Sequence, residues 1–336
     1  MNKFFIVLLA LASCQIDNDQ LMFENFQKFI TKYNKKYNSI NEFLSRFEIF
    51  KRNVKDVLSQ NYETFKVGIT KFSDLTQQEF SKTHLNRNYY NALEIENYEP
   101  VILQENLALP KSLDWRTYGR VSPVKNEGEE CDSHWAFSVV GNLEGLYYAR
   151  WKVMRRFSEQ MLIDCDDEDG DCHGGRPQIA FVWLKNNGGI MFEDDYPYVG
   201  KKQKCKKDPS KYAADFKITG YQKLGTREEK FHCVGESLVQ EFLYQKGPIS
   251  VCLNCKYLYS YVCGMLFYSR KECPVSGINH CVTLVGYGID DTYKSDYWLL
   301  KNSWGKDWGE NGYFRVIRGE GVCGINCEVT SATVEF

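Results

Sequence analysis

The sequence predicts an α+β fold in which a helical lobe packs against a strand lobe, with a separate helical segment ahead of both. Three observations lead to this class. A stretch near the N-terminus has helical periodicity, one long apolar helix follows in the middle of the chain, and the second half contains short runs typical of strands. A chain of 336 residues, 43% of them hydrophobic, can bury a core of this size.

The N-terminus has the pattern of a secretory signal peptide, which we place at residues 1–14. Lys3 supplies a positive charge, residues 4–12 form a short apolar core, and small residues follow. The run LASC at residues 11–14 also resembles a bacterial lipid-attachment box with Cys14 as the acylated residue, which is the less favoured alternative. No later stretch reaches the ~20 apolar residues that a membrane helix needs, so no membrane span is expected.

Cysteine content and charge narrow the class further. Thirteen cysteines in a chain with an export signal predict several disulfides and a secreted or lysosomal/endosomal protein. The formal net charge of -2 gives no reason to expect a nucleic acid partner. The basic run KKQKCKK at residues 201–207 is most simply a solvated loop, and a polyanion site there is the less favoured alternative.

The segment ahead of the two lobes is helical in pattern from Leu21 to about Phe80 and contains no cysteine. The pattern dissolves into polar residues and tyrosines between His84 and Leu109, as expected of a linker. We therefore assign residues 15–107 to a prosegment with its linker, which folds separately, and residues 108–336 to the body. The apolar residues that carry the helical pattern are Phe43, Phe47, Phe50, Val54, Val57 and Leu58.

Within the body, residues 133–150 read as one buried helix with Ser133 as its N-cap. The second half holds the strand candidates, which are rich in β-branched and aromatic residues: GPISVCL, HCVTLVGYG, DYWLLKNSWG and GYFRVIRG. A cleft between two packed lobes is the usual place for a site.

These motifs resemble papain-like cysteine peptidases of the cathepsin L and cathepsin F kind along essentially the whole chain. The inhibitory prodomain of that family has spaced Glu, Arg, Phe, Asn, Ile and Asn residues. The prosegment matches this pattern, with valine for isoleucine, at Glu42, Arg46, Phe50, Asn53, Val57 and Asn61. A companion motif, GITKFSD, matches at Gly68, Phe72 and Asp74, with Thr70 in place of asparagine. In the body, the runs that resemble conserved segments of the family are SPVKNEG, WAFSVVGNLEG, SEQMLIDC, CHGG, GINHCVTLVGYG and KNSWGKDWGENGYFRV.

The resemblance implies a papain-like fold, with a helical lobe, a β-barrel-like lobe, a cleft between them and an inhibitory prodomain in front. It also implies three disulfides, which join Cys131 to Cys172, Cys165 to Cys205 and Cys273 to Cys323. The pairing of Cys233, Cys252, Cys255, Cys263, Cys281 and Cys327 stays open. The CLNC run at residues 252–255 has redox spacing, but its strand context makes a redox site the less favoured alternative.

For the catalytic positions, the resemblance implies that His280 is the base, Asn302 orients its imidazole and Trp304 covers their hydrogen bond. The position of the nucleophilic cysteine, directly before the helix tryptophan, holds His134. The family's oxyanion glutamine corresponds to Glu127, whose ionised carboxylate would offer no donor. The loop also carries one extra residue among Glu129 and Glu130, and Asp132 stands in place of glycine, while Cys131 matches the disulfide half-cystine.

The expected substrate-binding positions are also altered. Gly174 and Gly175 match the wall along which a substrate backbone lies, and Trp304 borders the same cleft. Arg176 stands where an apolar residue often helps form the main specificity pocket, which suggests a preference for acidic or polar side chains unless Arg176 faces solvent. His173 replaces an asparagine, and Cys252 and Cys281 are expected to line the same region.

The leading hypothesis is a monomeric pseudopeptidase that binds peptides, protein inhibitors or peptidase partners, with its own prodomain as a further partner and with no cofactor. One alternative is an active cysteine-type hydrolase with an unconventional centre. Another is a zinc site built from His134, His280 and His173, which the resemblance places near one another. A milder variant is a cleft whose three histidines change their protonation in an acidic compartment.

Overall fold

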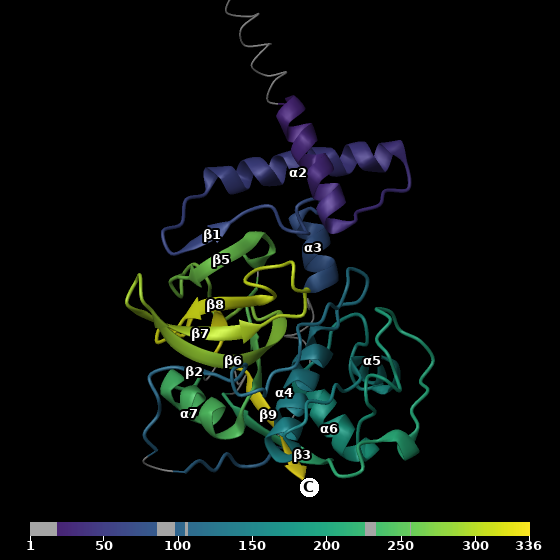
Figure 1. Cartoon of the computed structure of the whole chain (residues 1–336), viewed down its shortest axis with the longest axis vertical. Helices are drawn as coiled ribbons and strands as arrows, with labels where there is room; N and C mark the ends of the chain where they lie inside the picture. Colours follow the sequence, from purple (N-terminus) through teal and green to yellow (C-terminus); the bar gives the residue numbers. More distant parts are fainter. Residues whose placement is uncertain (1–18, 86–97, 105–106, 226–232, 256) are drawn as a thin grey trace, which may run out of the picture.

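The computed structural model describes residues 19–85, 98–104, 107–225, 233–255 and 257–336 (Figure 1). The predicted signal peptide and the alternative lipid-attachment box at residues 1–14 lie outside these ranges. Within them, no helix combines the length and the apolar character needed to cross a membrane. The prosegment helices stand at one end of the molecule, and the two lobes of the body lie beneath them (Figure 1).

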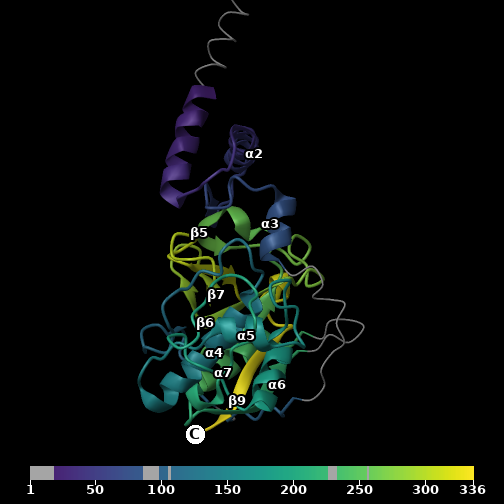
Figure 2. The ribbon, with the colours of Figure 1, turned by 90° about the vertical axis from the view of Figure 1, so that its right-hand side faces the viewer.

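The prosegment begins with two crossed helices, one at residues 19–33 and α2 at Ile40–Ser59 (Figures 1 and 2). Ser39 caps α2, since its hydroxyl accepts a hydrogen bond from the backbone N–H of Glu42 at 3.1 Å. Their contact is a small apolar core of its own, formed by Met22, Phe26, Phe29, Phe50 and Val54. Leu58, which the helical pattern assigned to the apolar set, is 73% exposed.

The rest of the prosegment joins the body directly. Strand β1 (Phe65–Val67) pairs antiparallel with β5 (Tyr261–Leu266) of the body. Helix α3 (Gln77–His84) starts in a capping box, in which Thr76 and Glu79 exchange backbone and side-chain hydrogen bonds. Phe72 and Phe80 are buried in the same apolar cluster as Trp304 of the body. The prosegment therefore shares a core with the body, and only its first two helices form a separate cluster.

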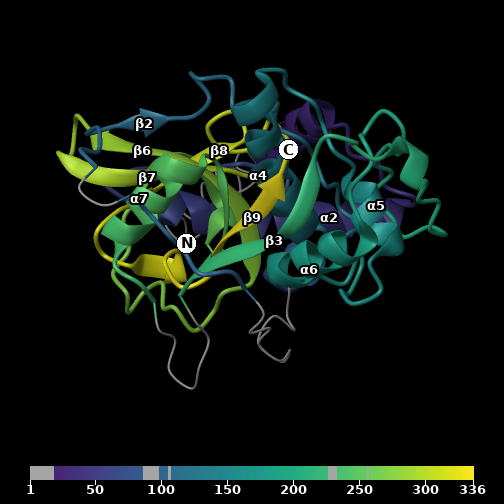
Figure 3. The same cartoon turned by 90° about the horizontal axis from the view of Figure 1, so that it is seen from below.

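The helical lobe is built on α4 (His134–Trp151), with α5 (Glu159–Cys165) and α6 (Pro177–Asn187) packed on it. Every residue of α4 from His134 to Leu146 is buried, including the polar Ser138, Asn142 and Glu144. Ser133 occupies the N-cap position, but its side chain makes no capping bond and lies 2.9 Å from the Tyr198 hydroxyl instead. Figure 3 shows these helices on one side of the body and most of the strands on the other.

The strand lobe contains a nine-stranded sheet in the order β1-β5-β8-β7-β6-β4-β9-β3, and β2 (Leu113–Asp114) pairs with β6. The predicted strand runs correspond to β4 (Ile249–Leu253), β6 (His280–Asp290), β7 (Ser295–Lys301) and β8 (Tyr313–Ile317). Strands β3 (Lys217–Leu224), β5 and β9 (Val329–Glu335) and helix α7 (Glu236–Lys246) were not among the predicted elements. The 3-10 turns lie at Pro209–Lys211, Leu258–Ser260 and Val322–Gly324.

The described part of the expected linker, residues 98–104, is bonded to the body. The backbone N–H of Glu99 donates to the Tyr221 carbonyl at 2.8 Å, and the Gln222 side chain donates to the Pro100 carbonyl at 2.8 Å. Further along, Gln104 and Gln245 of α7 exchange hydrogen bonds. This stretch is a strap along β3 and α7.

Disulfides join Cys131 to Cys172, Cys165 to Cys205 and Cys273 to Cys323, which are the pairs that the resemblance implies. Two further bridges join Cys252 to Cys281 and Cys233 to Cys327. Among the described cysteines, Cys255 and Cys263 are free thiols. The CLNC run therefore holds one bridged cysteine and one buried thiol.

Candidate active site

Two histidines meet where the lobes join. His134 is the first residue of α4, and His280 is the first residue of β6. Their ring centroids are 4.5 Å apart, and both side chains are fully buried. The fold thus brings together the position expected for the nucleophile and the position expected for the base.

The imidazole of His280 is oriented by Asn302. Its Nε2 lies 2.9 Å from Asn302 Oδ1, and because an amide oxygen only accepts, Nε2 carries the proton and Nδ1 has the lone pair. Nδ1 is buried and makes no hydrogen bond within the described part of the chain. The Trp304 ring lies beside this pair, with its centroid 4.8 Å from that of His280. Burial and the neighbouring His134 lower the pKa of His280 well below its usual value, while Asn302 opposes this shift.

The imidazole of His134 is held differently. Its Nδ1 accepts a hydrogen bond from the backbone N–H of Cys281 at 3.0 Å, so the ring proton is on Nε2. Nε2 lies 3.2 Å from Oδ1 of Asp132, which is also buried. Burial lowers the pKa of His134 to about 3, so the ring is neutral at physiological pH. The only lone pair of this neutral ring is already occupied by a backbone donor.

Glu127 faces the tryptophan side of the cleft. Its Oε1 accepts a hydrogen bond from Trp304 Nε1 at 2.7 Å, and its Oε2 accepts one from the Ser303 hydroxyl at 2.9 Å. Burial and the nearby Asp132 carboxylate raise the pKa of Glu127 well above its usual value. Burial therefore opposes the ionised carboxylate expected at this position, whereas the hydrogen bonds from Ser303 and Trp304 favour it. Both carboxyl oxygens are engaged with residues of the strand lobe.

The prosegment covers this site. Phe72, Phe80 and His84 surround the Trp304 indole, with ring centroids 5.2, 5.4 and 6.0 Å from it. His84 is fully buried, and its Nδ1 lies 2.7 Å from the Thr83 hydroxyl. Burial lowers the pKa of His84 to about 3, with smaller contributions from Lys71 and His280. Sequence reasoning did not assign His84 to the site, since its position at the end of a prosegment helix carries no local signal for such a contact.

His173 does not join the two cleft histidines. Its side chain is 88% exposed, and its Nδ1 lies 3.0 Å from Asp171 Oδ1 on the surface. The predicted set of His134, His280 and His173 is wrong for this reason, and no group of three potential metal ligands occurs in the described ranges. The third imidazole near the cleft is His84 of the prosegment, and the lone pair of His134 is already in use.

The glycine wall has the geometry that the sequence predicts for a close backbone approach. A Cβ at Gly175 would lie 2.6 Å from the Trp135 ring, and Gly174 has a φ of 95°, which other residues rarely adopt. Arg176 follows at the N-cap of α6 and is only 6% exposed, so the alternative that it faces solvent is wrong. Its backbone N–H donates to Asp169 Oδ1 at 2.8 Å. Nearby, Cys252 and Cys281 form an apolar cluster with Ile278 and Cys327.

A hollow of about 740 Å³ lies between α3 of the prosegment and the strand lobe. Prosegment and body both contribute to its lining, which has polar and apolar parts. The lining includes Gln77, Gln78 and Ser81 on one side and Asn254, Gly277 and Asn279 on the other. Space for a ligand therefore exists beside the covered histidines.

Sequence comparison agrees with this architecture. The family described as papain family cysteine protease matches residues 109–333, and the cathepsin propeptide inhibitor domain matches residues 26–80. Cathepsin F of Mus musculus is 40% identical over 315 residues, which cover 92% of this chain and 64% of that protein, so the chain spans less than two thirds of this relative. The viral cathepsin of Spodoptera litura multicapsid nucleopolyhedrovirus is 34% identical over 348 residues, which cover 98% of both chains.

Solved precursor structures have the same arrangement. The digestive procathepsin L 3 of Tenebrio molitor larval midgut has a TM-score of 0.80 and 32% identity, with 93% of this chain and 99% of that chain covered. The recombinant stem bromelain precursor has a TM-score of 0.80 and 31% identity, with 93% and 98% covered. The chain therefore belongs to the papain family of cysteine proteases and carries a cathepsin propeptide inhibitor domain ahead of the protease domain.

Proposed function

We propose that this protein is a papain-family member without peptidase activity, in which His134 stands at the position of the nucleophilic cysteine. The observation that carries this proposal is the hydrogen bond from the Cys281 N–H to His134 Nδ1 at 3.0 Å. A nucleophile must present a free electron pair to the substrate carbonyl. In His134 one nitrogen accepts this backbone bond and the other carries the proton beside Asp132.

Attack by His134 would need the other tautomer. Nε2 would have to lose its proton, and the Cys281 N–H would then lose its buried acceptor, which costs about 1–3 kcal/mol. The oxyanion side gives no compensation, because both oxygens of Glu127 are engaged with Trp304 and Ser303. Loss of one oxyanion donor alone typically lowers turnover by ~10²-fold or more. These two features together support loss of the reaction.

The scaffold supports binding in place of cleavage. Gly174 and Gly175 keep two adjacent positions without side chains, along which a peptide backbone could lie. The hollow beside α3, with polar and apolar parts to its lining, offers room for a peptide, a protein inhibitor or a segment of a partner peptidase. We propose that the protein acts in a secreted or lysosomal/endosomal setting, because the N-terminal export pattern and the bridged cysteines favour an oxidising route.

A second candidate function is a hydrolase with an unconventional centre. The observation that favours it is the intact pair of His280 and Asn302, whose Nδ1 lone pair faces the cleft without a hydrogen bond in the described ranges. Such a pair is still arranged as a general base. A different nucleophile, such as water, would have to reach it.

Turnover of a fluorogenic dipeptide substrate tests both candidates. A protease recognition sequence inserted after Leu107 allows the prosegment to be cut and removed at mildly acidic pH. We expect no turnover by the natural chain and measurable turnover by a His134→Cys, Glu127→Gln double variant under reducing conditions, because the cysteine restores a nucleophile and the glutamine restores a donor.

A His173→Cys variant is the matched control, since it adds a thiol at an exposed position and should stay inactive. Turnover by the natural chain that disappears in a His280→Ala variant would establish the second candidate and refute the first.

A further inference from the structure

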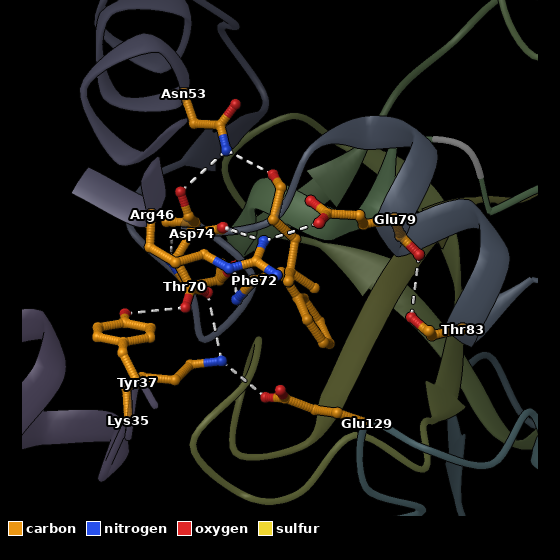
Figure 4. A network of polar contacts seen from close by, with 12 residues as sticks. Lys35, Tyr37, Arg46, Asn53, Thr70, Phe72, Asp74, Glu79, Thr83 and Glu129 are labelled. Atoms are coloured by element: carbon orange, nitrogen blue, oxygen red, sulfur yellow. Dashed lines mark hydrogen bonds and ion pairs between the residues drawn. The ribbon is translucent and has the colours of Figure 1, made fainter. Parts of the chain in front are cut away.

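A lysine of the prosegment contacts the body loop at residues 126–130. Lys35 Nζ lies 2.7 Å from Glu129 Oε1, and the Lys35 side chain is only 9% exposed (Figure 4). Glu129 lies in the stretch where the loop is one residue longer than the family pattern. The Glu129 carboxylate of this loop therefore forms an ion pair with a nearly buried lysine of the prosegment.

Lys35 is held in place by the prosegment itself. Its ammonium also lies 3.3 Å from Asp74 Oδ1, and the other oxygen of Asp74 accepts a hydrogen bond from the Tyr37 hydroxyl at 3.0 Å. Arg46 fixes the backbone at the same residue, because its Nη1 donates to the Asp74 carbonyl at 3.1 Å and to Glu79 Oε1 at 2.9 Å (Figure 4). A preorganised cation loses little conformational entropy when it binds a carboxylate.

A second prosegment lysine contacts the same loop. Lys71 is 5% exposed, and its Nζ donates to Asn126 Oδ1 at 3.0 Å. The same oxygen accepts the backbone N–H of Gly128 at 3.2 Å, so this contact also shapes the loop. The charges are complementary, since the loop carries the exposed Glu129 and Glu130 and the facing prosegment carries Lys35 and Lys71.

We infer that the loop at residues 126–130 adds a specific contact to the interface between body and prosegment, beside the β1–β5 pairing and the shared apolar core, and that Glu129 makes this contact through Lys35. The prosegment then stays bound as a non-covalent subunit after the chain is cut. The inference does not rest on the proposed function, because it concerns only the contact between prosegment and body. The experiment below measures binding of the prosegment and not turnover. The inference can therefore fail while the proposed function holds, and the proposed function can fail while the inference holds.

The test uses the full chain with the recognition sequence inserted after Leu107. After cutting at neutral pH and low salt, size-exclusion chromatography should recover both fragments in one peak. The release rate of the prosegment, followed after dilution, should rise about three- to tenfold in Glu129→Gln, which is the range for a partly exposed ion pair at an interface. Glu130→Gln is the matched control, because it removes a neighbouring exposed carboxylate and should leave the rate unchanged.

A double-variant cycle separates the pair from the effect of Lys35 on Asp74. Lys35→Met alone also disturbs Asp74, but this contribution is the same whether residue 129 is Glu or Gln. We expect Glu129→Gln to have almost no further effect on the release rate in the Lys35→Met background. Three results would overturn the inference. They are additive effects of the two substitutions on the release rate, equal effects of Glu129→Gln and Glu130→Gln, and dissociation of the natural fragments immediately after cutting.

Discussion

At the scale of single residues, the cleft is organised by which nitrogen of each imidazole carries a proton. Asn302 places the proton of His280 on Nε2, and the Cys281 N–H places the proton of His134 on Nε2 as well. The lone pair of His280 therefore stays available, whereas that of His134 does not. Under the proposed function, the imidazole at position 134 offers no free electron pair and makes a structural hydrogen bond to the backbone instead.

The buried histidines predict a pH dependence of stability. His84 has a pKa of about 6.5 in the unfolded chain and of about 3 in the folded chain. Between these two pH values the unfolded chain binds a proton at His84 and the folded chain does not. Its stabilising contribution is complete above pH 6.5 and is lost as the pH falls towards 3. At pH 5 the loss is about 2 kcal/mol for one such histidine.

The measurement is the free energy of unfolding at pH 7 and pH 5 for the natural chain and for His84→Gln. Glu127 and Asp132 act in the opposite direction, since burial raises their pKa values, and comparison between variants cancels their contribution. We expect the natural chain to lose about 2 kcal/mol more than His84→Gln over this interval. His173→Gln, at an exposed position, should retain the full pH dependence, and an equal slope in His84→Gln and the natural chain would contradict the prediction.

Sequence reasoning placed the cleft residues well but could not describe their states. The positions of His134, His280, Asn302 and Trp304 follow from motifs, because each motif fixes a position on a helix or strand. The raised pKa of Glu127 depends on its burial beside Trp304 and Ser303, which lie far along the chain. The error on His173 has the same origin, since a backbone bridge to Asp132 places the residue by the loop while its ring turns to solvent.

At the scale of elements, the contact between α4 and β6 places the two cleft histidines opposite each other. Gly141 allows this approach, because a Cβ at that position would collide with the Thr283 hydroxyl of β6. We expect Gly141→Ala to reduce the free energy of unfolding by about 1–3 kcal/mol, as overpacking in a tight core does. Chemical denaturation of the full chain measures this change.

The partner substitution provides the check. Thr283→Ala removes the colliding hydroxyl, so the loss in a Gly141→Ala, Thr283→Ala double variant should be clearly smaller than the sum of the two single losses. Simple additivity would mean that the strain lies elsewhere in the lobe.

The strands show what local patterns can and cannot identify. Strands β4, β6, β7 and β8 are short β-branched and aromatic runs bounded by glycine, and they were recognised from that pattern. Strand β3 (KITGYQKL) mixes lysine and glycine with apolar residues, and β9 (VTSATVE) is mostly small and polar, so neither has a strong strand signal. They form because they pair with each other over a long sequence separation, from Lys217 with Glu335 to Leu224 with Val329.

At the scale of the whole molecule, the prosegment consists of two parts with different attachments. Residues 65–85 share the core of the strand lobe, while the first two helices bury their own aromatic cluster around Phe26 and Phe50. The expectation of a separately folding prosegment therefore describes only the first two helices. A helical pattern in the sequence cannot distinguish a helix that packs on its neighbour from one that packs on another lobe.

This division predicts local unfolding. Phe50→Ala should destabilise the helix pair by about 3–5 kcal/mol, since Phe50 is fully buried in its small cluster. Hydrogen exchange should then accelerate in residues 19–59, while amides of α4 and β6 keep their protection. Loss of protection throughout the body after this one change would show that the molecule unfolds as a single unit.

Cys281 has a further consequence for any attempt to restore the enzyme. Its side chain is bridged to Cys252, and its backbone N–H touches the side chain at position 134. A thiolate introduced by His134→Cys would therefore lie near the backbone of a disulfide-bonded cysteine, and from this we expect thiol–disulfide exchange through a mixed disulfide. Mass spectrometry of the His134→Cys variant should find a share of molecules with position 134 linked to Cys281 or Cys252. The bridge and a reactive cysteine would thus compete, and the turnover expected of the His134→Cys, Glu127→Gln variant would require reductant to keep position 134 as a free thiol.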